Sequence, residues 1–454
     1  MHRSISTRTF CALVFATSIL VILVGCGFPS PTSDNPDTEV ASSTTSTEDA
    51  AWPLQVLSDR PAQPPVAGQY TETEPNDTFA NAEVVANDGI VDLLGGIAAG
   101  TDPADMDIYR LRGGDTGDRV QVTLTIRSGY DLVLGLLDDR QRLLSYADPG
   151  SVVNGPRQID IVLHEPTSEL IAIVAARSSS SSDRLYTARV TMQPAAGIPP
   201  YQPQVVVLNF DGGDAVKIGR RSPVYVPPFD AAAIDPRFTG QTETIIDLIV
   251  QSVREDYAGL GVEVYASGDP SIPAGSVSSV YFGTYNSALL GLADNVDPYN
   301  TQSDQSAILF TDTFRLFNVF NPSAADIAQV LANVASHEAG HLLGLRHTAD
   351  VMDLMDITAS ARQMLSDQWF RNATIHPTVL PTGSQDAPAL LEWTLGGTLI
   401  GPPAGKVAHL QRHAATLNDP SDFHIPHGLL GTCGGEIDNA ATDDNQVKEM
   451  ANAN

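Results

Sequence analysis

The chain has 454 residues, enough for two or three domains, and 42% of them are hydrophobic, which is ordinary for a globular protein. Its 54 acidic residues outnumber its 25 basic ones, for a formal charge of −29 at pH 7. A surface this acidic repels phosphate backbones and argues against nucleic-acid binding. It suits both an extracytoplasmic location and Ca²⁺ binding by surplus carboxylates, and charge alone does not decide between them.

The first 25 residues have the pattern of an export signal. Arg3 and Arg8 precede an apolar run, residues 11–24, that is too short for a comfortable membrane span. The Leu-Val-Gly-Cys sequence at residues 23–26 resembles a bacterial lipobox. This resemblance implies that Cys26 carries a lipid and holds the protein on the cell envelope, at the outer membrane or cell surface, without spanning it. An ordinary signal peptide or an anchor helix is the alternative.

A disordered tether and then a β-rich domain are predicted next. Residues 26–68 are rich in Ser, Thr, Pro, Asp and Ala, a composition that buries too little apolar surface to offset the entropy of ordering. Residues 69–193 show short β-type runs between turn residues. Three of these runs alternate apolar and polar positions, and a fourth is almost continuously apolar: 120–126, 159–163, 186–192 and 170–175, respectively. This spacing predicts an antiparallel β-sandwich.

The β-rich segment also resembles a known accessory module. The Glu-Thr-Glu-Pro-Asn-Asp-Thr sequence at 72–78 and the Asp-Met-Asp-Ile-Tyr sequence at 105–109 are similar to the bacterial pre-peptidase C-terminal (PPC) domain. That resemblance implies an accessory domain of a secreted peptidase, placed here near the start of the chain. Asp102, Asp105 and Asp107 are candidate Ca²⁺ ligands, with a solvated acidic turn as the alternative.

After a Pro- and Gly-rich linker at 194–204, residues 203–375 alternate strand and helix patterns. Apolar residues at i, i+4 spacing predict an amphipathic helix over 242–257. Strands are predicted at 205–210, 262–265, 277–282, 289–293 and 307–310. Together they predict an α+β domain, a twisted mixed sheet with two long helices. Residues 376–454 are predicted to be a poorly defined C-terminal extension.

The second long helix carries the decisive motif. Ser323 is the predicted N-cap, with Asp326 completing a capping box. One helix face continues through residues spaced +3, +4, +3 and +4: Ile327, Val330, Val334, His337 and His341. Both histidines therefore extend the inward-facing apolar stripe. Two histidines one turn apart on a helix can bind one metal ion.

Residues 337–347 together form an HExxHxxGxxH motif. Gly344 can adopt a positive φ and turn the chain, so that His347 returns to the metal as a third ligand. Three neutral ring nitrogens suit zinc and leave a fourth position for water. Glu338, beside the first ligand, would accept the proton of that water as it attacks a peptide carbonyl.

Met355 follows His347 by eight residues, in a Val-Met-Asp-Leu-Met-Asp sequence. With the histidine motif, this is similar to the matrixin-like metzincin peptidases, whose Met-turn places a methionine beneath the zinc ligands. The resemblance implies one catalytic Zn²⁺ and a substrate held along an edge strand, here at Leu289, Gly291 and Ala293. An ordinary sheet edge is the alternative for that strand.

These features predict a zinc metalloendopeptidase that hydrolyses extracytoplasmic proteins or peptides and meets the membrane through its lipid anchor only. The alternative is a lipid-anchored binding or adhesion protein whose metzincin domain is a catalytically idle, zinc-stabilised scaffold. Intact Glu338 and Gly344 favour the enzyme, because a scaffold needs neither a base nor an open coordination position. The sequence predicts neither the substrate nor the oligomeric state.

Overall fold

The computed structural model describes residues 68–402, except 87–88, 101–104, 130, 149–154 and 178–181. Contacts place the described residues in one compact unit. The predicted export signal, the anchor Cys26, nearly all of the tether and the calcium candidate Asp102 lie outside the described residues. Within the described ranges, every helix is too short or too polar to cross a membrane.

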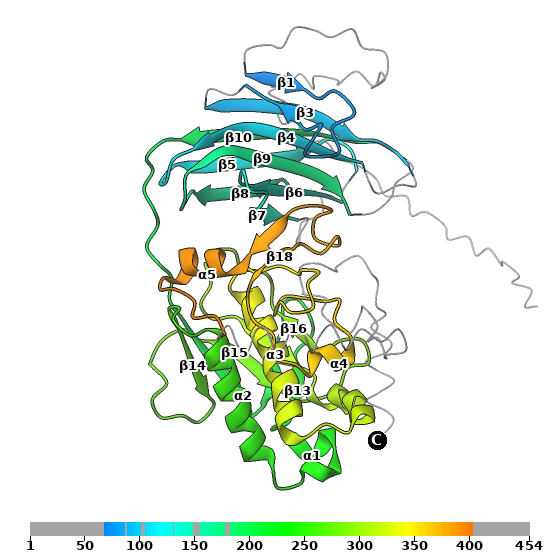
Figure 1. The fold of residues 1–454 in the computed structure, drawn as a ribbon, viewed down its shortest axis with the longest axis vertical. Coiled ribbons are helices and arrows are strands. Elements are labelled where there is room, and N and C mark those ends of the chain that lie inside the picture. The colour runs from blue at the N-terminus through cyan, green and yellow to red at the C-terminus, as the bar shows by residue number, and fades with distance from the viewer. Residues whose placement is uncertain are drawn as a thin grey trace, which may run out of the picture. The chain divides into compact units, whose positions relative to one another are not determined.

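Two five-stranded sheets form the first folded part, with strand orders β1-β3-β10-β5-β8 and β2-β4-β9-β6-β7. Residues of both sheets, such as Val122 and Val174, share one apolar core, so the sheets are the layers of a sandwich (Figure 1). The strands are β1 (Gln69–Thr71), β2 (Glu83–Val84), β3 (Ile90–Ile97), β4 (Met106–Gly114), β5 (Arg119–Ile126), β6 (Leu132–Leu137), β7 (Leu143–Ala147), β8 (Arg157–Val162), β9 (Thr167–Ala176) and β10 (Arg184–Gln193).

The sequence predicted an antiparallel sandwich, and this prediction is wrong for two pairs of strands. β1 runs parallel to β3, and β2 runs parallel to β4. From β1 to β4 the chain crosses from one sheet to the other at every connection, so the strands that pair in parallel are not consecutive in the chain. The remaining pairs in both sheets are antiparallel.

The sheet that contains β9 is buried on both faces. All six residues of β6 are buried, and so are the last seven of β9. One face joins the sandwich core, and the other packs against Ile375, Val379 and Leu380, which follow the predicted metal motif in the chain. This explains the continuous apolar run at 170–175, because a strand covered on both faces does not alternate.

The second folded part is a five-stranded mixed sheet of order β14-β11-β15-β17-β16. Four of its strands run parallel and β16 is antiparallel at one edge. Two long helices pack on it and share its apolar core (Figure 1). These elements are β11 (Gln204–Asn209), β14 (Val262–Ala266), β15 (Ser278–Phe282), β16 (Gly291–Ala293), β17 (Ser306–Leu309), α2 (Thr242–Asp256) and α3 (Ala324–Leu342).

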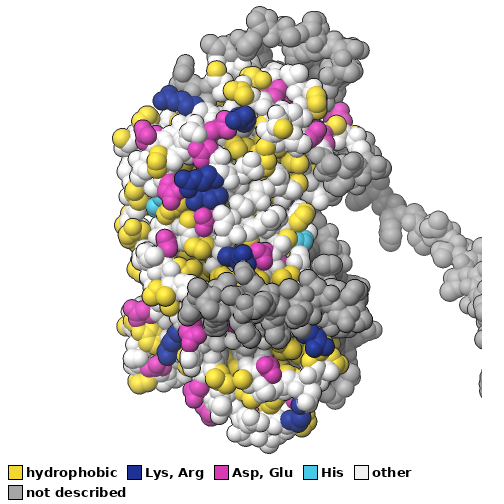
Figure 2. Space-filling view, in the orientation of Figure 1, with side chains coloured by type: hydrophobic (Ala, Val, Ile, Leu, Met, Phe, Trp, Pro, Cys, Tyr) yellow, Lys and Arg dark blue, Asp and Glu magenta, His cyan; other side chains and the backbone are white. Residues whose placement is uncertain are grey.

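Several smaller elements carry no clear sequence signal. They include a β19–α5 unit within residues 376–402, where no defined structure was predicted. The smaller elements are β12 (Gly213–Val216), β13 (Val224–Val226), α1 (Ala231–Ile234), η1 (Pro236–Phe238), η2 (Thr311–Phe320), α4 (Ala361–Met364), β18 (Asn372–Thr374), β19 (Ser384–Asp386) and α5 (Ala387–Leu395). On the face drawn in Figure 2, acidic side chains are scattered among apolar and uncharged ones, which spreads the negative charge.

Candidate metal centre

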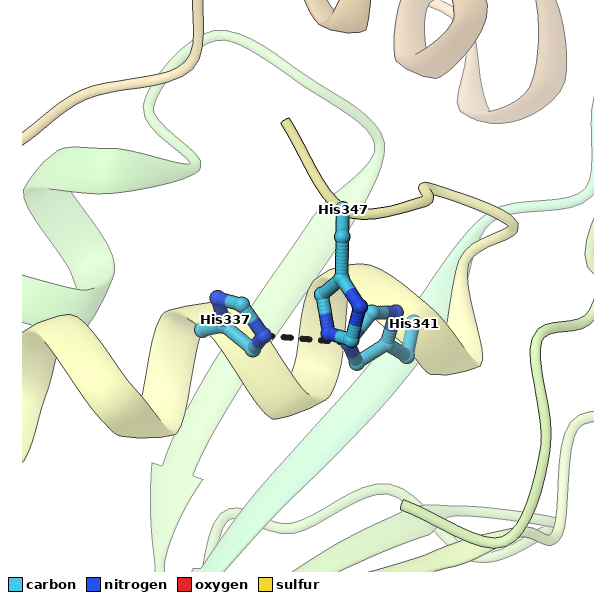
Figure 3. A group of neighbouring side chains, drawn as sticks. All are labelled: His337, His341 and His347. Carbon is cyan, nitrogen blue, oxygen red and sulfur yellow. Dashed lines mark hydrogen bonds between the residues drawn. The ribbon is translucent and has the colours of Figure 1, made fainter. Parts of the chain in front are cut away.

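α3 carries two of the three predicted metal ligands. It begins at the predicted capping box: the Ser323 hydroxyl accepts from the Asp326 N–H, and the Asp326 carboxylate accepts from the Ser323 N–H. Near its other end, His337 and His341 project on one side, and His347 returns towards them from the segment after the helix (Figure 3). The His341 Nε2 lies 3.0 Å from that of His337 and 3.2 Å from that of His347.

The turn that follows α3, residues 343–347 (the ligand turn), depends on Gly344. Gly344 has a φ of +95°, a conformation that costs glycine little. The Gly344 N–H donates to the His341 carbonyl at 2.9 Å, and the Leu345 N–H donates to the Gly340 carbonyl at 2.9 Å. A Cβ at position 344 would lie 2.8 Å from the Pro298 Cα. Both conformation and space therefore require glycine at this position.

Hydrogen bonds fix the tautomers of two ligands. His337 Nδ1 lies 2.7 Å from the Leu354 carbonyl oxygen, and His341 Nδ1 lies 2.8 Å from that of Leu345. A carbonyl oxygen only accepts, so each Nδ1 carries a proton, and in the neutral form of each ring the unprotonated nitrogen is then Nε2, which faces the other histidines. An unprotonated ring nitrogen is the atom through which a neutral histidine binds a metal ion.

The three histidines fit a zinc ion. They form a buried group whose ring nitrogens lie within 4.8 Å of one another. Zinc–nitrogen bonds of about 2.0–2.1 Å at tetrahedral angles place neighbouring nitrogens about 3.3 Å apart, close to the observed 3.0 and 3.2 Å. Backbone carbonyls that hold the distal ring nitrogens are the usual outer support of a histidine–metal site.

Met355 lies beneath the same helix. Its side chain is fully buried, and a Cβ on Gly340 would lie 2.7 Å from its sulfur. The turn that carries Met355 also contacts the ligands through its backbone: Leu354 accepts from His337, and Met355 accepts from the Thr348 N–H at 2.9 Å. Sequence reasoning singled out Met355 but missed the Leu345 and Leu354 carbonyls, because backbone acceptors have no residue signature.

Glu338 lies next to this group and faces a pocket. It is 1% exposed, and its Oε2 atom has no hydrogen-bond partner among the described residues. Burial raises the pKa of the Glu338 carboxyl well above its usual range. A bound cation nearby would favour the ionised form and oppose that shift. The pocket is lined by His337 and Glu338 together with Leu290, Gly291, Val334 and Met364.

The predicted substrate strand lies beside Glu338. β16 is the last strand of the mixed sheet and pairs antiparallel with β17, Gly291 opposite Leu309. The Phe310 N–H donates to the Leu290 carbonyl, which extends the pairing by one residue. Gly291 and Ala293 therefore belong to an edge strand, and Leu289 is buried just before it. Within the described chain, β16 has a strand on one side only.

We expect Gly291→Ala to lower any hydrolytic activity of this site while metal binding by the three histidines is kept. A Cβ on Gly291 would overlap the Glu338 carboxylate, so that carboxylate must move, and a displacement of a catalytic group by about 1 Å costs roughly 10²-fold in rate. Activity and zinc content of the purified variant test this. Gly401→Ala is the control, because its Cβ would meet nothing within 4 Å. Equal activities of Gly291→Ala and Gly401→Ala would contradict the predicted effect of the contact between position 291 and the Glu338 carboxylate.

Asp353, in the turn that carries Met355, is a buried acid that sequence reasoning did not single out. Its side chain is fully buried. One carboxylate oxygen accepts from the Thr348 hydroxyl at 2.6 Å, and the other has no partner among the described residues. The pKa of Asp353 is raised to about 7, and burial is the largest cause of this rise. The folded protein therefore binds this proton more tightly than the unfolded chain does.

We expect Asp353→Asn to gain stability relative to the parent as pH rises. The folded-state pKa lies above the unfolded value of about 3.9, so ionisation between about pH 4 and pH 7 destabilises the parent but not the amide. At about 1.4 kcal/mol per unit, the gain above pH 7 is at most about 4 kcal/mol. Urea unfolding at several pH values measures it, with the exposed Asp247→Asn as control. Parallel pH profiles of Asp353→Asn and parent would contradict the prediction.

Five acidic residues of the sandwich form two overlapping groups, one of Glu74, Asp77 and Asp105 and one of Glu72, Glu74 and Asp107. Burial and the neighbouring Asp107 raise the pKa of Glu72, and burial raises that of Asp107 to about 7. Sequence reasoning named Asp105 and Asp107. It did not name Glu72, Glu74 and Asp77, although all three lie within the PPC-like sequence at residues 72–78.

No protein-family model matches the sequence, and no curated protein matches it. Among the solved structures that are similar to parts of the chain are the following three. The pre-peptidase C-terminal domain of a Bacillus anthracis collagenase shares 12% identity at a TM-score of 0.19, covering 27% of this chain and 100% of that one. Archaemetzincin from Methanopyrus kandleri shares 13% at 0.22, covering 37% and 89%. A zinc-dependent peptidase from Methanocorpusculum labreanum shares 16% at 0.19, covering 36% and 95%. Likenesses this remote carry no argument, so a functional assignment rests on the residues of the metal centre.

Proposed function

We propose that the protein is a zinc-dependent endopeptidase. One observation carries the proposal: three buried imidazoles bring their Nε2 atoms together, and Glu338, which has an unpartnered carboxylate oxygen, lines the adjoining pocket. A structural zinc site closes its coordination with a fourth protein ligand, whereas a catalytic site keeps that position open. The described residues supply three ligands and a carboxylate, which is the catalytic pattern.

In the proposed reaction the histidines, Glu338 and β16 have separate roles. His337, His341 and His347 would hold the zinc ion, which when bound supplies Lewis-acid chemistry by polarising a carbonyl and lowering the pKa of a coordinated water. Glu338 accepts a proton from the attacking water at its carboxylate and passes it to the leaving amine. In the described chain no strand pairs with the side of β16 that faces away from β17, and pairing of an extended peptide with that side would suit a protein or peptide substrate.

Hydrolysis of fluorescently labelled casein by the full chain tests the proposal. We expect activity that is lost on chelation and returns when stoichiometric Zn²⁺ is added back. A zinc-loaded protein that cleaves neither casein nor gelatin would contradict an endopeptidase and favour the second candidate, a lipid-anchored binding protein with an idle zinc scaffold. The buried, unpartnered oxygen of Glu338 argues against an idle scaffold, because such a group costs stability without a use in the fold.

We also propose that the protein is exported and lipid-anchored at Cys26. The support is the sequence of residues 1–26, which lies outside the described residues. Replacement of Cys26 by serine removes the thiol that would be lipidated, so we expect the variant to move from the membrane fraction to the soluble fraction. Unchanged fractionation would contradict the anchor. Absence of nucleic-acid binding stays a prediction from charge.

Calcium binding to the sandwich also stays a proposal. Its support is the convergence of Glu74, Asp77 and Asp105, whose oxygens are the ligand type that Ca²⁺ prefers. A rise in melting temperature with added Ca²⁺, lost in Asp105→Asn, would support it. A melting temperature that does not change with Ca²⁺ would contradict it.

A further inference from the structure

Arg346 lies between two parts of the metal centre. The residue before it, Leu345, supplies the carbonyl that accepts from His341 Nδ1 at 2.8 Å. The residue after it, His347, is the third ligand. A shift of the Arg346 backbone therefore disturbs the orientation of one ligand and the position of another. Arg346 is itself 6% exposed although it carries a charge, so its surroundings must compensate for the lost water.

The backbone of Arg346 is held on both sides by Gln385 of β19. The Arg346 N–H donates to Gln385 Oε1 at 2.7 Å, and Gln385 Nε2 donates to the Arg346 carbonyl at 2.8 Å. Gln385 is fully buried. Its strand is fixed to the sandwich in turn, because the Ser384 N–H donates to the Gln141 carbonyl at 3.0 Å.

The side chain of Arg346 reaches the sandwich directly. Its Cζ lies 4.2 Å from the centre of the Tyr146 ring, on β7, and its Nη1 lies 3.4 Å from the Asp148 carboxylate. Tyr146 is 4% exposed, so this cation–π contact is shielded from water, the condition in which such contacts are strongest. This ion pair is longer than a strong charge-assisted hydrogen bond.

A second connection reaches the ligand turn from the loop after β16. The Asp297 N–H donates to the His341 carbonyl at 3.1 Å, and Pro298 is the residue that leaves no room for a Cβ at Gly344. The neighbouring Tyr299 hydroxyl donates to the Leu144 carbonyl of β7 at 3.0 Å. Both connections from the ligand turn therefore end on the same sandwich strand.

We propose that the β-sandwich is a structural part of the metal centre: through Tyr146 and β19 it holds Arg346, a positioning residue, and so places His347 and the carbonyl that orients His341. The inference rests on the proposed zinc site. It gives the sandwich a role beyond that of an independent accessory module. If Tyr146 on β7 is replaced, metal binding by the histidines of the second folded part becomes weaker.

Four single variants of the full chain test the proposal. Arg346→Met keeps the apolar stem and removes the charge, Tyr146→Leu removes the ring, and Tyr146→Phe keeps the ring and removes the hydroxyl. His164→Leu is the matched control. His164 is also a sandwich residue at this interface, where its ring stacks on Trp393 at 5.5 Å and on Tyr299 at 6.4 Å, but it belongs to neither of the contacts that Arg346 makes with Tyr146 and Gln385. Zinc affinity is measured by chelator competition, and ligand geometry by the visible spectrum of the Co²⁺-substituted protein.

We expect Arg346→Met and Tyr146→Leu to bind zinc about 10–100-fold more weakly than the parent, the range typical for lost outer supports of metal ligands, with altered Co²⁺ bands. Tyr146→Phe should keep parental affinity and spectrum. His164→Leu should lower the melting temperature of the zinc-free protein but keep its zinc affinity. If Arg346→Met does not fold, the comparison of Tyr146→Leu with Tyr146→Phe still tests the proposal.

Two results would overturn the inference, and they are distinguishable. If the parent binds zinc and cleaves casein but Tyr146→Leu binds zinc as tightly as His164→Leu, the sandwich does not position the ligands and the proposed function stands. If the parent binds no stoichiometric zinc, the proposed function falls, and the positioning role of Arg346 falls with it.

Discussion

Glu338→Gln is expected to lower the rate of peptide hydrolysis by about 10²–10⁴-fold, the usual contribution of a general base, while zinc binding is kept. The amide has nearly the shape of the carboxylate, so it fills the same space against Gly291 but cannot accept the proton. The rate constant for casein or peptide cleavage measures the loss, and metal analysis of the same sample shows that zinc remains.

Glu243→Gln is the matched control, because Glu243 is an exposed glutamate in the first turn of α2. It should hydrolyse substrate at the parental rate. If Glu338→Gln retained parental activity with a full complement of zinc, another group would have to be the base, and the catalytic role given to Glu338 would be wrong.

Gly344→Ala is expected to weaken zinc binding by at least about 10–100-fold, the loss reported when supports of a metal ligand are removed. Alanine at the φ of +95° seen there costs about 1–2 kcal/mol. Its Cβ would also meet the Pro298 Cα at 2.8 Å. Backbone is less free to move than a flexible side chain, so the ligand turn has to open and His347 leaves the other two histidines.

Gly240→Ala separates the two effects in that variant. Gly240 also has a positive φ, +77°, but a Cβ there would meet nothing within 4 Å. Its replacement should cost a similar conformational free energy in urea unfolding and leave zinc affinity unchanged. Equal zinc affinities for Gly344→Ala and Gly240→Ala would show that the ligand turn does not set the position of His347.

The elements nearest the metal were the most predictable because their signals are local. The capping box of Ser323 and Asp326, the stripe that ends in His337 and His341, and the positive φ of Gly344 all follow from spacings within one helix and its end. Helix periodicity and capping need no knowledge of the rest of the chain.

What escaped prediction depends on contacts between distant segments. Gln385 and Arg346 are 39 residues apart, and nothing in either residue's neighbourhood indicates that they pair. The same holds for β19 and α5, which are short and are fixed by packing more than by their own periodicity. The continuous apolar run of β9 did carry a signal of burial on both faces, but the sequence does not say that residues 375–380 provide the cover.

X-ray absorption spectroscopy at the zinc edge, on the purified full chain, tests the central claim most directly. The structure predicts one zinc ion per chain with three imidazole nitrogens at about 2.0–2.1 Å, and two in His347→Ala. A protein without stoichiometric zinc, or a spectrum with the same number of imidazoles in parent and His347→Ala, would contradict it.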